Sequence, residues 1–220
     1  MCGRFSLTIA ESQTILHRFG LKKIAFDLKP RYNIVPSQQI AVILNESSEN
    51  LTEATWGLIP HWAKDESTSY KMINARAESI NEKPAYKEPF EHKRCLIIAD
   101  SFYEWNSKKP YRMMMKDEGL YSYAGIWDRW KDRTTCSIIT TTPNELMKKI
   151  HIRMPVILPK EQEKKWLSQI KPEEALTMLK PFDATQMKAY EISPLVNSVK
   201  NESPDVIKPL AKYGLGKFIS

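Results

Sequence analysis

Short runs of apolar, β-branched and aromatic residues recur along most of the chain, and polar or proline-containing stretches separate them. Runs of this length and composition are typical of β-strands. The pattern therefore predicts a fold made mostly of strands. The predicted strands are Gln39–Leu44, Leu51–Gly57, Arg94–Asp100, Phe102–Trp105, Tyr111–Met115, Leu120–Ile126, Thr135–Thr141, Pro155–Leu158 and Met187–Ile192.

Helical spacing of apolar residues occurs in three places. The first predicted helix follows Thr8-Ile9-Ala10-Glu11, which has the form of a capping box, and Gly20 provides its stop. Two further helices are predicted over Lys160–Ile170 and Pro172–Leu179, because each has a proline near its start and acidic residues in its first turn.

Many strands, few helices and no regular βαβ alternation predict an α+β fold. We expect a single domain over residues 1–220, with a strongly curved, barrel-like, mostly antiparallel β core and peripheral helices. No Gly/Ser-rich linker divides the chain, and the tail at about 211–220 is expected to be mobile. Such a core gathers loops from distant parts of the sequence at one end, where we expect the functional site.

The balance of charge favours an anionic partner. Lys and Arg number 33 against 26 Asp and Glu, which gives a net charge of +7 and a pI near 9.2. A surplus of this kind attracts polyanions such as nucleic acid, although scattered basic residues also fit an ordinary solvated surface. The longest apolar runs are strand-sized and no secretion signal is visible, so we expect a soluble cytoplasmic protein without membrane contact.

Three cysteines divide into two kinds by their surroundings. Cys95 and Cys136 lie inside strand-like apolar runs, so both are predicted to be buried and reduced. The histidines share no ligand spacing with the cysteines, so we expect no metal and no cofactor. Cys2 stands apart, because removal of Met1 gives this residue both a thiol and a free α-amine.

An N-terminal cysteine has chemistry that no other residue offers. Its α-amine has a pKa near ~7.7 to 8.0, so the neutral, nucleophilic form is well populated at pH 7. Such an amine condenses with an aldehyde to an imine, and the neighbouring sulfur then closes a five-membered thiazolidine ring. Ring closure is favoured because the two groups are held together in one residue. This chemistry needs an exposed aminothiol at Cys2.

Polar residues embedded among apolar ones form several dense clusters, in which each polar side chain must be satisfied or used. The ordered series resembles the SOS response-associated peptidase family, whose members are described as abasic-site processing proteins. The resemblance extends from Cys2 to about Pro209, and the ordered set is far more specific than any one cluster. Its motifs are Met1–Phe5, Arg31–Asn33 with Pro36, Trp56–Trp62, Asn74–Glu78, Phe102–Trp105, His151–Pro155 and Val196–Asn201.

The resemblance implies a protein that recognises abasic sites in single-stranded DNA, removes its own Met1 and traps the lesion through Cys2. It also implies a set of catalytic and DNA-binding positions. The implied catalytic residues are Cys2, Asn74, Glu104 and His151. The implied DNA contacts are Arg4 and Arg76 to phosphates, Asn33, Pro36 and Trp62 along the DNA channel, and Thr140 to the backbone.

Elementary chemistry agrees with these assignments. An abasic sugar is mostly a closed hemiacetal, so a proton donor such as His151 is needed to open it. Glu104, between two aromatic residues, suits a partly dry pocket with a raised pKa and a role in moving protons. Asn74 is never charged and can orient the amine or the sugar. His61 stands where some relatives carry a smaller residue, so the local strand-separating surface is expected to differ.

Three functions remain open from the sequence. The favoured one is covalent capture of abasic DNA by a monomer, associated with the nucleoid in a bacterium, with lyase activity where β-elimination outruns ring closure. The second is a peptidase of the N-terminal-nucleophile kind that acts on peptides. The third is a non-covalent binder of single-stranded DNA in which Cys2 has no chemical role.

Overall fold

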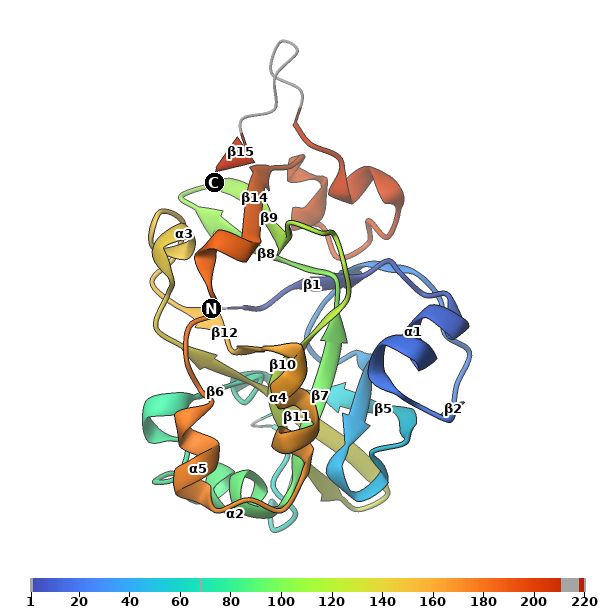
Figure 1. Ribbon diagram of the computed structural model, residues 1–220, viewed down its shortest axis with the longest axis vertical. Helices are drawn as coiled ribbons and strands as arrows, with labels where there is room; N and C mark the ends of the chain where they lie inside the picture. The colour runs from blue at the N-terminus through green and yellow to red at the C-terminus, as the bar shows by residue number, and fades with distance from the viewer. Residues whose placement is uncertain (1, 68, 211–217, 220) are drawn as a thin grey trace.

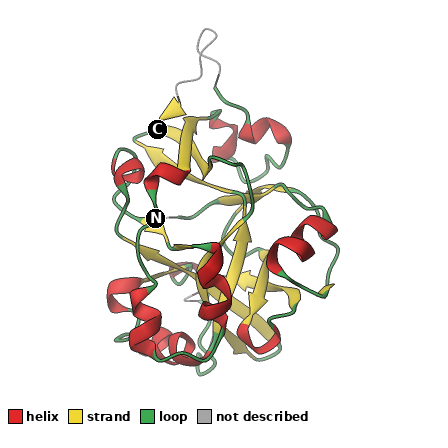
Figure 2. Cartoon of the chain, viewed as in Figure 1, coloured by secondary structure: helices red, strands yellow, loops and turns green. Residues whose placement is uncertain are grey.

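Five strands close into a small barrel at the centre of the molecule (Figures 1 and 2). The computed structural model describes residues 2–67, 69–210 and 218–219. Around the barrel the order is β11, β10, β7, β4 and β5, and a parallel pairing of β5 with β11 closes the ring. The other four pairings are antiparallel. The bounds are β4 Gln39–Leu44, β5 Asn50–Trp56, β7 Arg94–Ala99, β10 Tyr121–Trp130 and β11 Arg133–Thr141.

A second sheet lies against one end of the barrel (Figure 1). Its strand order is β15, β14, β9, β8, β1 and β3. In this sheet β1 lies between β8 and β3, with Phe5 opposite Phe102. The strand that follows Cys2 is therefore held beside the strand that carries Glu104. The bounds are β1 Phe5–Leu7, β3 Arg31–Ile34, β8 Ser101–Asn106, β9 Lys109–Met115, β14 Met187–Glu191 and β15 Phe218–Ile219.

Two short strands flank the end of β11. β6 (Asn74–Arg76) runs parallel to β11 and places Arg76 beside Thr140, whereas β12 (Met154–Pro155) is antiparallel and places Pro155 beside the same threonine. β6 and β12, which are distant in the sequence, thus both lie beside Thr140. The remaining strands are β2 Lys23–Ile24, which pairs with β5, and β13 Ile157–Leu158, which pairs with β10.

Helices lie around the outside of the strands (Figure 2). Three of them, α2, α4 and α5, surround the end of the barrel that is far from the second sheet (Figure 1). The α-helices are α1 Ser12–Phe19, α2 Pro84–His92, α3 Glu145–Lys148, α4 Lys160–Leu167 and α5 Pro172–Thr177. Turns of 3₁₀ helix are η1 Asn45–Ser47, η2 Ser69–Lys71, η3 Ala77–Ser79, η4 Ala184–Gln186, η5 Pro194–Asn197 and η6 Pro204–Ile207.

The predicted α+β fold with a barrel-like core is confirmed. The predicted capping box is wrong: α1 begins at Ser12 with Glu11 at its N-cap, and Thr8 instead donates its amide and hydroxyl to the buried carboxylate of Asp100. Gly20 does end the helix, in the left-handed conformation with φ 66° that glycine adopts without strain. The predicted strand Pro155–Leu158 is divided between β12 and β13.

Cys95 and Cys136 are free and fully buried, as predicted. Cys95 packs against Gly125 of the neighbouring strand, where an added Cβ would lie 2.8 Å from the sulfur. In the described part of the chain, no helix is long and apolar enough to cross a membrane. The tail expected to be mobile lies mostly outside the described residues, but Phe218–Ile219 form β15 against β14.

Candidate active site

Asn74 and Cys2 are joined by a direct hydrogen bond. The Nδ2 of Asn74 donates to the backbone carbonyl of Cys2 at 2.9 Å. Asn74 is half-buried at the start of β6, which the barrel strand β11 holds in place. Its Oδ1 is buried and has no hydrogen-bond partner among the described residues. Asn74 therefore fixes the backbone of the candidate nucleophile and keeps one acceptor available.

The expectation that Cys2 is exposed is wrong for the structure of this chain, because the residue has no exposed surface. The reason lies in the segment that follows it. Phe5 packs edge-on against Trp56 and Tyr123, at centroid distances of 5.2 and 5.8 Å, and draws the start of the chain between the two sheets. This burial was not foreseen, because position in the sequence says nothing of how far a terminus enters a core.

Burial also controls the protonation of the Cys2 sulfur. It raises the pKa of the thiol well above its ordinary value, and the negative charge of Glu104 raises it further. A hydrogen bond from the Arg4 backbone to the sulfur opposes these effects without reversing them. The sulfur is therefore a protonated thiol at neutral pH, so a reaction at Cys2 requires a group that accepts its proton.

Glu104 is the group best placed for that purpose. It lies in β8 with 3% of its surface exposed, and burial raises the pKa of its carboxyl. The positive charges of the amino terminus and of His151 oppose this rise. The expectation that the pKa of Glu104 is raised is confirmed. Cys2, Glu104 and His151 thus belong to one electrostatic group, and the hydrogen bond of Asn74 brings it into the same site.

His151 lies half-buried just after α3 and ahead of β12. Its Nδ1 accepts a hydrogen bond of 3.1 Å from the backbone N–H of Arg153. The same Nδ1 lies 3.3 Å from the Arg153 carbonyl, so this nitrogen can accept from the N–H or, when it carries a proton, donate to the carbonyl. The backbone of Arg153 therefore orients the His151 ring.

The strand that joins Cys2 to the fold is anchored by Asp100. Ser6 donates its hydroxyl to Oδ1 at 2.5 Å, and the backbone N–H of Ile9 donates to Oδ2 at 3.0 Å. Thr8 donates to the same carboxylate oxygen from both its amide and its hydroxyl. Sequence reasoning missed this role of Asp100, although the residue lies just ahead of the Phe102–Trp105 motif. Its only signal was a carboxylate directly after an apolar strand.

Arg4 and Asn33 build a loop rather than lie free on the surface. Arg4 donates to the Val196 carbonyl and to Asn33 Oδ1, and its guanidinium lies 5.7 Å from the ring centre of Trp105. Asn33 is fully buried, and its Nδ2 approaches the carbonyls of Val196, Ser198 and Asn201 at 2.9 to 3.3 Å. Asn33 therefore has a structural role in this loop, and its expected place in the lining of a DNA channel stays a prediction.

Thr140 likewise has no exposed surface, so the expected contact with a DNA backbone is not available to its side chain. Its oxygens instead accept hydrogen bonds from Arg153. Arg76 is exposed two residues after Asn74, and Pro36 is half-buried after β3. Arg76 therefore remains the exposed cation closest along the chain to the residues that hold Cys2.

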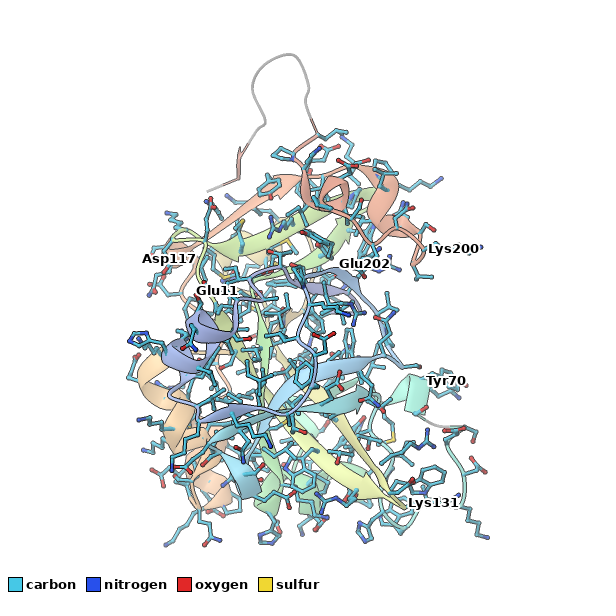
Figure 3. All side chains as sticks on the ribbon, turned by 90° about the vertical axis from the view of Figure 1, so that its right-hand side faces the viewer. Glu11, Tyr70, Asp117, Lys131, Lys200 and Glu202 are labelled. Carbon is cyan, nitrogen blue, oxygen red and sulfur yellow. The ribbon has the colours of Figure 1, made fainter. Side chains whose placement is uncertain are left out.

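Trp62 lies on a turn that β10 holds at two points. The His61 N–H donates to Asp128 Oδ2 at 2.8 Å, and the Trp130 indole donates to the Ala63 carbonyl at 2.8 Å. The Trp62 side chain is 60% exposed between these anchors. Tyr70, 61% exposed, extends outward on the same side of the molecule as Lys200 (Figure 3). Trp62 and Tyr70 are thus two exposed aromatic rings, and the Lys71 ammonium lies 5.3 Å from the ring centre of Tyr70.

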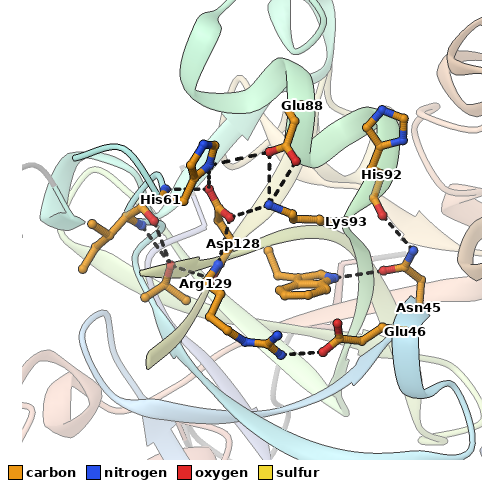
Figure 4. Close-up of polar contacts among 11 residues, drawn as sticks. Asn45, Glu46, His61, Glu88, His92, Lys93, Asp128 and Arg129 are labelled. Carbon is orange, nitrogen blue, oxygen red and sulfur yellow. Dashed lines mark hydrogen bonds and ion pairs between the residues drawn. The ribbon is translucent and has the colours of Figure 1, made fainter. Parts of the chain in front are cut away.

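The side chain of His61 turns toward Asp128 and Glu88 (Figure 4). Among the described residues, His61, Glu88 and Asp128 are the one group with metal-ligand spacing, with ligand atoms within 4.8 Å of one another. The Lys93 ammonium already lies 3.0 Å from Glu88 and 2.8 Å from Asp128. These residues form an ion-pair cluster that anchors the turn. His61 therefore helps to set the position of Trp62 on that turn.

Comparison with known proteins gives a consistent family match. A sequence model described as SOS response associated peptidase (SRAP) matches residues 1–199. The abasic site processing protein YoqW of Bacillus subtilis (strain 168) is 47% identical over 223 residues, which cover 94% of this chain and 99% of YoqW. The abasic site processing protein HMCES of Gallus gallus is 31% identical, and the match covers 83% of this chain and 67% of HMCES.

Solved structures show the same fold. A crystal structure of a protein from Bacteroides thetaiotaomicron superposes with a TM-score of 0.87 at 32% identity, over 96% of this chain and all of that one. A protein from Bordetella bronchiseptica superposes with a TM-score of 0.78 at 21% identity, over 87% of this chain and 100% of that one. The second match concerns the fold alone.

Proposed function

The chain belongs to the SOS response associated peptidase family, and from this premise we propose that it acts on abasic sites in single-stranded DNA. Its reaction is covalent capture of the opened sugar by Cys2, and it requires that removal of Met1 opens this buried residue to the sugar. The observation that carries the proposal is the meeting of Cys2, Asn74, Glu104 and His151, which come from four separate motifs, in one partly buried group.

The reaction begins with opening of the sugar. His151 in its protonated form donates the Nε2 proton to the ring oxygen as the C1–O bond breaks, and the Glu104 carboxylate takes the proton of the 1-hydroxyl to give the aldehyde and returns it to the imidazole. The freed α-amine of Cys2 then attacks the aldehyde carbon. The Glu104 carboxylate takes the two amine protons in turn and passes them to the former carbonyl oxygen, which leaves as water to give the imine. Asn74 holds the Cys2 carbonyl throughout, so the amine and the sulfur keep a fixed orientation.

Ring closure completes the capture. The Cys2 sulfur forms a bond to the imine carbon, the C=N bond becomes single, and the thiol proton reaches the nitrogen through Glu104. In the product the former aldehyde carbon is bonded to both the sulfur and the nitrogen of Cys2, and one water has been released overall. A buried thiol of raised pKa needs this proton acceptor, which explains why a carboxyl lies beside it. Where the imine loses its 3′-phosphate by β-elimination first, the outcome is strand incision.

DNA binding is attributed to charge and stacking. Arg76 is exposed near the group of four residues, and a guanidinium binds two phosphate oxygens at once. Trp62 offers an exposed ring on which an unpaired base can stack irrespective of sequence. The net charge of +7 adds a general attraction for the phosphate backbone.

The deciding experiment mixes the protein, freed of Met1 as checked by intact mass, with single-stranded DNA that carries one abasic site. We expect a product that survives denaturing electrophoresis and has the mass of protein plus DNA minus one water. Neither Cys2→Ala nor Cys2→Ser can form the thiazolidine, so neither should give the stable product, although both keep the α-amine and should still give strand cleavage or a labile imine. Cys95→Ala removes a buried thiol outside the site and should crosslink normally.

Two outcomes would favour the other functions. Cys2-dependent cleavage of unrelated peptides without any DNA adduct would support a peptidase. Binding that gives no adduct and is lost at high salt would support a simple single-strand binder.

A further inference from the structure

Asn74 and His151 reach the site from opposite sides of one strand. β6, which begins at Asn74, pairs with one side of β11, and β12, which begins three residues after His151, pairs with the other side. Both pairings meet at Thr140. The distance between the two catalytic residues therefore depends on how firmly β6 and β12 are held across this point.

An ion pair spans that point. Arg153 Nη1 lies 2.6 Å from Glu78 Oε1, and Nη2 lies 2.9 Å from Oε2, so the guanidinium and carboxylate face each other in the two-bond arrangement. Nη2 also donates to the Thr140 carbonyl at 2.7 Å. The Arg153 side chain is only 13% exposed, and the pair lowers the pKa of the Glu78 carboxyl. The Glu78 side chain is 49% exposed, so solvent screens the pair in part, and the arginine is held mainly by the two-bond geometry and by its bond to Thr140.

The same arginine holds the catalytic histidine through its backbone. Its N–H donates to His151 Nδ1 at 3.1 Å. Because the guanidinium is fixed to Glu78 and Thr140, the N–H of the residue is fixed as well. The imidazole is thereby held in one orientation.

We propose that Glu78 and Arg153 are positioning residues, which set the imidazole of His151 relative to Asn74 and Glu104 for proton transfer. Neither residue needs to touch the sugar. Both belong to motifs of the family series, at the end of Asn74–Glu78 and in the middle of His151–Pro155, but sequence reasoning gave neither a role. The inference rests on the proposed function, because it concerns the same site.

If Arg153 instead binds a DNA phosphate, substitution of Glu78 should have the opposite effect. The Arg153 Nε is buried without a partner among the described residues, so a DNA phosphate is a conceivable acceptor for this guanidinium. Glu78 would then compete with DNA, and its neutralisation would strengthen DNA binding. If Glu78 and Arg153 position His151, neutralising Glu78 should leave DNA binding unchanged and slow the crosslinking step.

The test uses Glu78→Gln and Glu78→Asp in the full chain freed of Met1. Affinity for abasic single-stranded DNA is measured in the Cys2→Ala background, and the single-turnover crosslinking rate is measured in the reactive protein across pH. For Glu78→Gln we expect affinity within about twofold of the parent, a rate lowered by about tenfold or more, and a displaced His151 limb of the pH–rate profile. Glu78→Asp, which keeps the charge, should recover part of the rate.

Glu46→Gln is the matched control, because it removes an exposed glutamate–arginine pair with Arg129 at 2.5 Å, away from the site (Figure 4). Thermal unfolding of each variant accompanies the kinetics. Tighter DNA binding by Glu78→Gln, or a slower rate with an undisplaced pH profile and a lower Tm, would overturn the positioning role. If the parent protein itself forms no adduct, the proposed function fails; if it reacts and Glu78→Gln reacts equally fast, only the positioning role fails.

Discussion

The side-chain amide of Asn74 holds the backbone carbonyl of Cys2 at 2.9 Å, so the candidate nucleophile is fixed by a residue 72 positions away in the sequence. A neutral amide can do this without exchanging protons with Glu104. In the proposed reaction two tasks are separate: Asn74 orients the start of the chain, and the ionisable side chains move protons.

Asn74→Ala should therefore slow crosslinking much more than it weakens DNA binding. We expect a rate lower by about ten- to a hundredfold, because the reacting amine is misplaced once its orienting hydrogen bond is removed. Single-turnover kinetics with abasic single-stranded DNA measure this, beside affinity in the Cys2→Ala background. Asn45→Ala removes a similar 2.9 Å bond to the His92 carbonyl, together with a 3.0 Å bond accepted from the Trp127 indole, and serves as the control. Equal losses in both variants would refute the role of Asn74.

Glu104 should give the folded protein a characteristic pH dependence. Its pKa is raised by burial, so the folded state favours the protonated carboxyl, and the stabilisation is complete below the ordinary value of about 4.3 and is lost as pH rises through the folded pKa. Glu104→Gln mimics the protonated form. It should raise the Tm at pH 7 and leave it unchanged near pH 4, while abolishing crosslinking. A variant that is less stable at pH 7 would contradict this account.

Trp62→Ala should weaken binding to single-stranded DNA and leave the fold intact. Loss of one stacked base costs about 1–3 kcal/mol, whereas a side chain that is 60% exposed contributes little to the core. Titration of labelled DNA and thermal unfolding give the two quantities. Trp62→Phe keeps a ring and should retain most of the affinity; if it binds as poorly as Trp62→Ala, stacking is not the cause.

Arg76→Gln should reduce both the affinity for DNA and its dependence on salt. Removing one cation that neutralises a phosphate of a single strand lowers the slope of log K against log salt by about 0.7. Binding isotherms at several salt concentrations measure that slope. Lys29→Gln, which removes an exposed lysine paired with Asp27, should leave the slope unchanged. If the slopes of the two variants are the same, Arg76 does not bind a phosphate specifically.

The strands of the barrel were predictable because apolar runs such as Arg94–Asp100 must be buried wherever they pair. Gly20 was predictable for a similar local reason, since the stop of a helix is a property of its own backbone. Thr8 was not, because its partner is Asp100, 92 residues further on, and local spacing favoured a capping box. Asn33 shows the same limit, because its amide donates to the carbonyl of Asn201, which lies 168 residues further along the chain.

The sequence motifs predicted which residues form the candidate site, but not how those residues are arranged in space. The motifs supplied Cys2 and Glu104, yet nothing in them indicated that the sulfur would lie inside the fold. Glu78 and Arg153 were both visible in the sequence as charged residues among apolar ones. Their pairing across Thr140 depends on the register of three strands, which only the structure provides.

The enclosure of Cys2 affects how long the residue stays intact. Peroxide oxidises a cysteine through an accessible thiolate, and this sulfur is neither ionised nor open to solvent. Oxidants and alkylating agents in the surrounding medium therefore reach it slowly. While it stays enclosed, the Cys2 thiol is therefore protected from chemical modification.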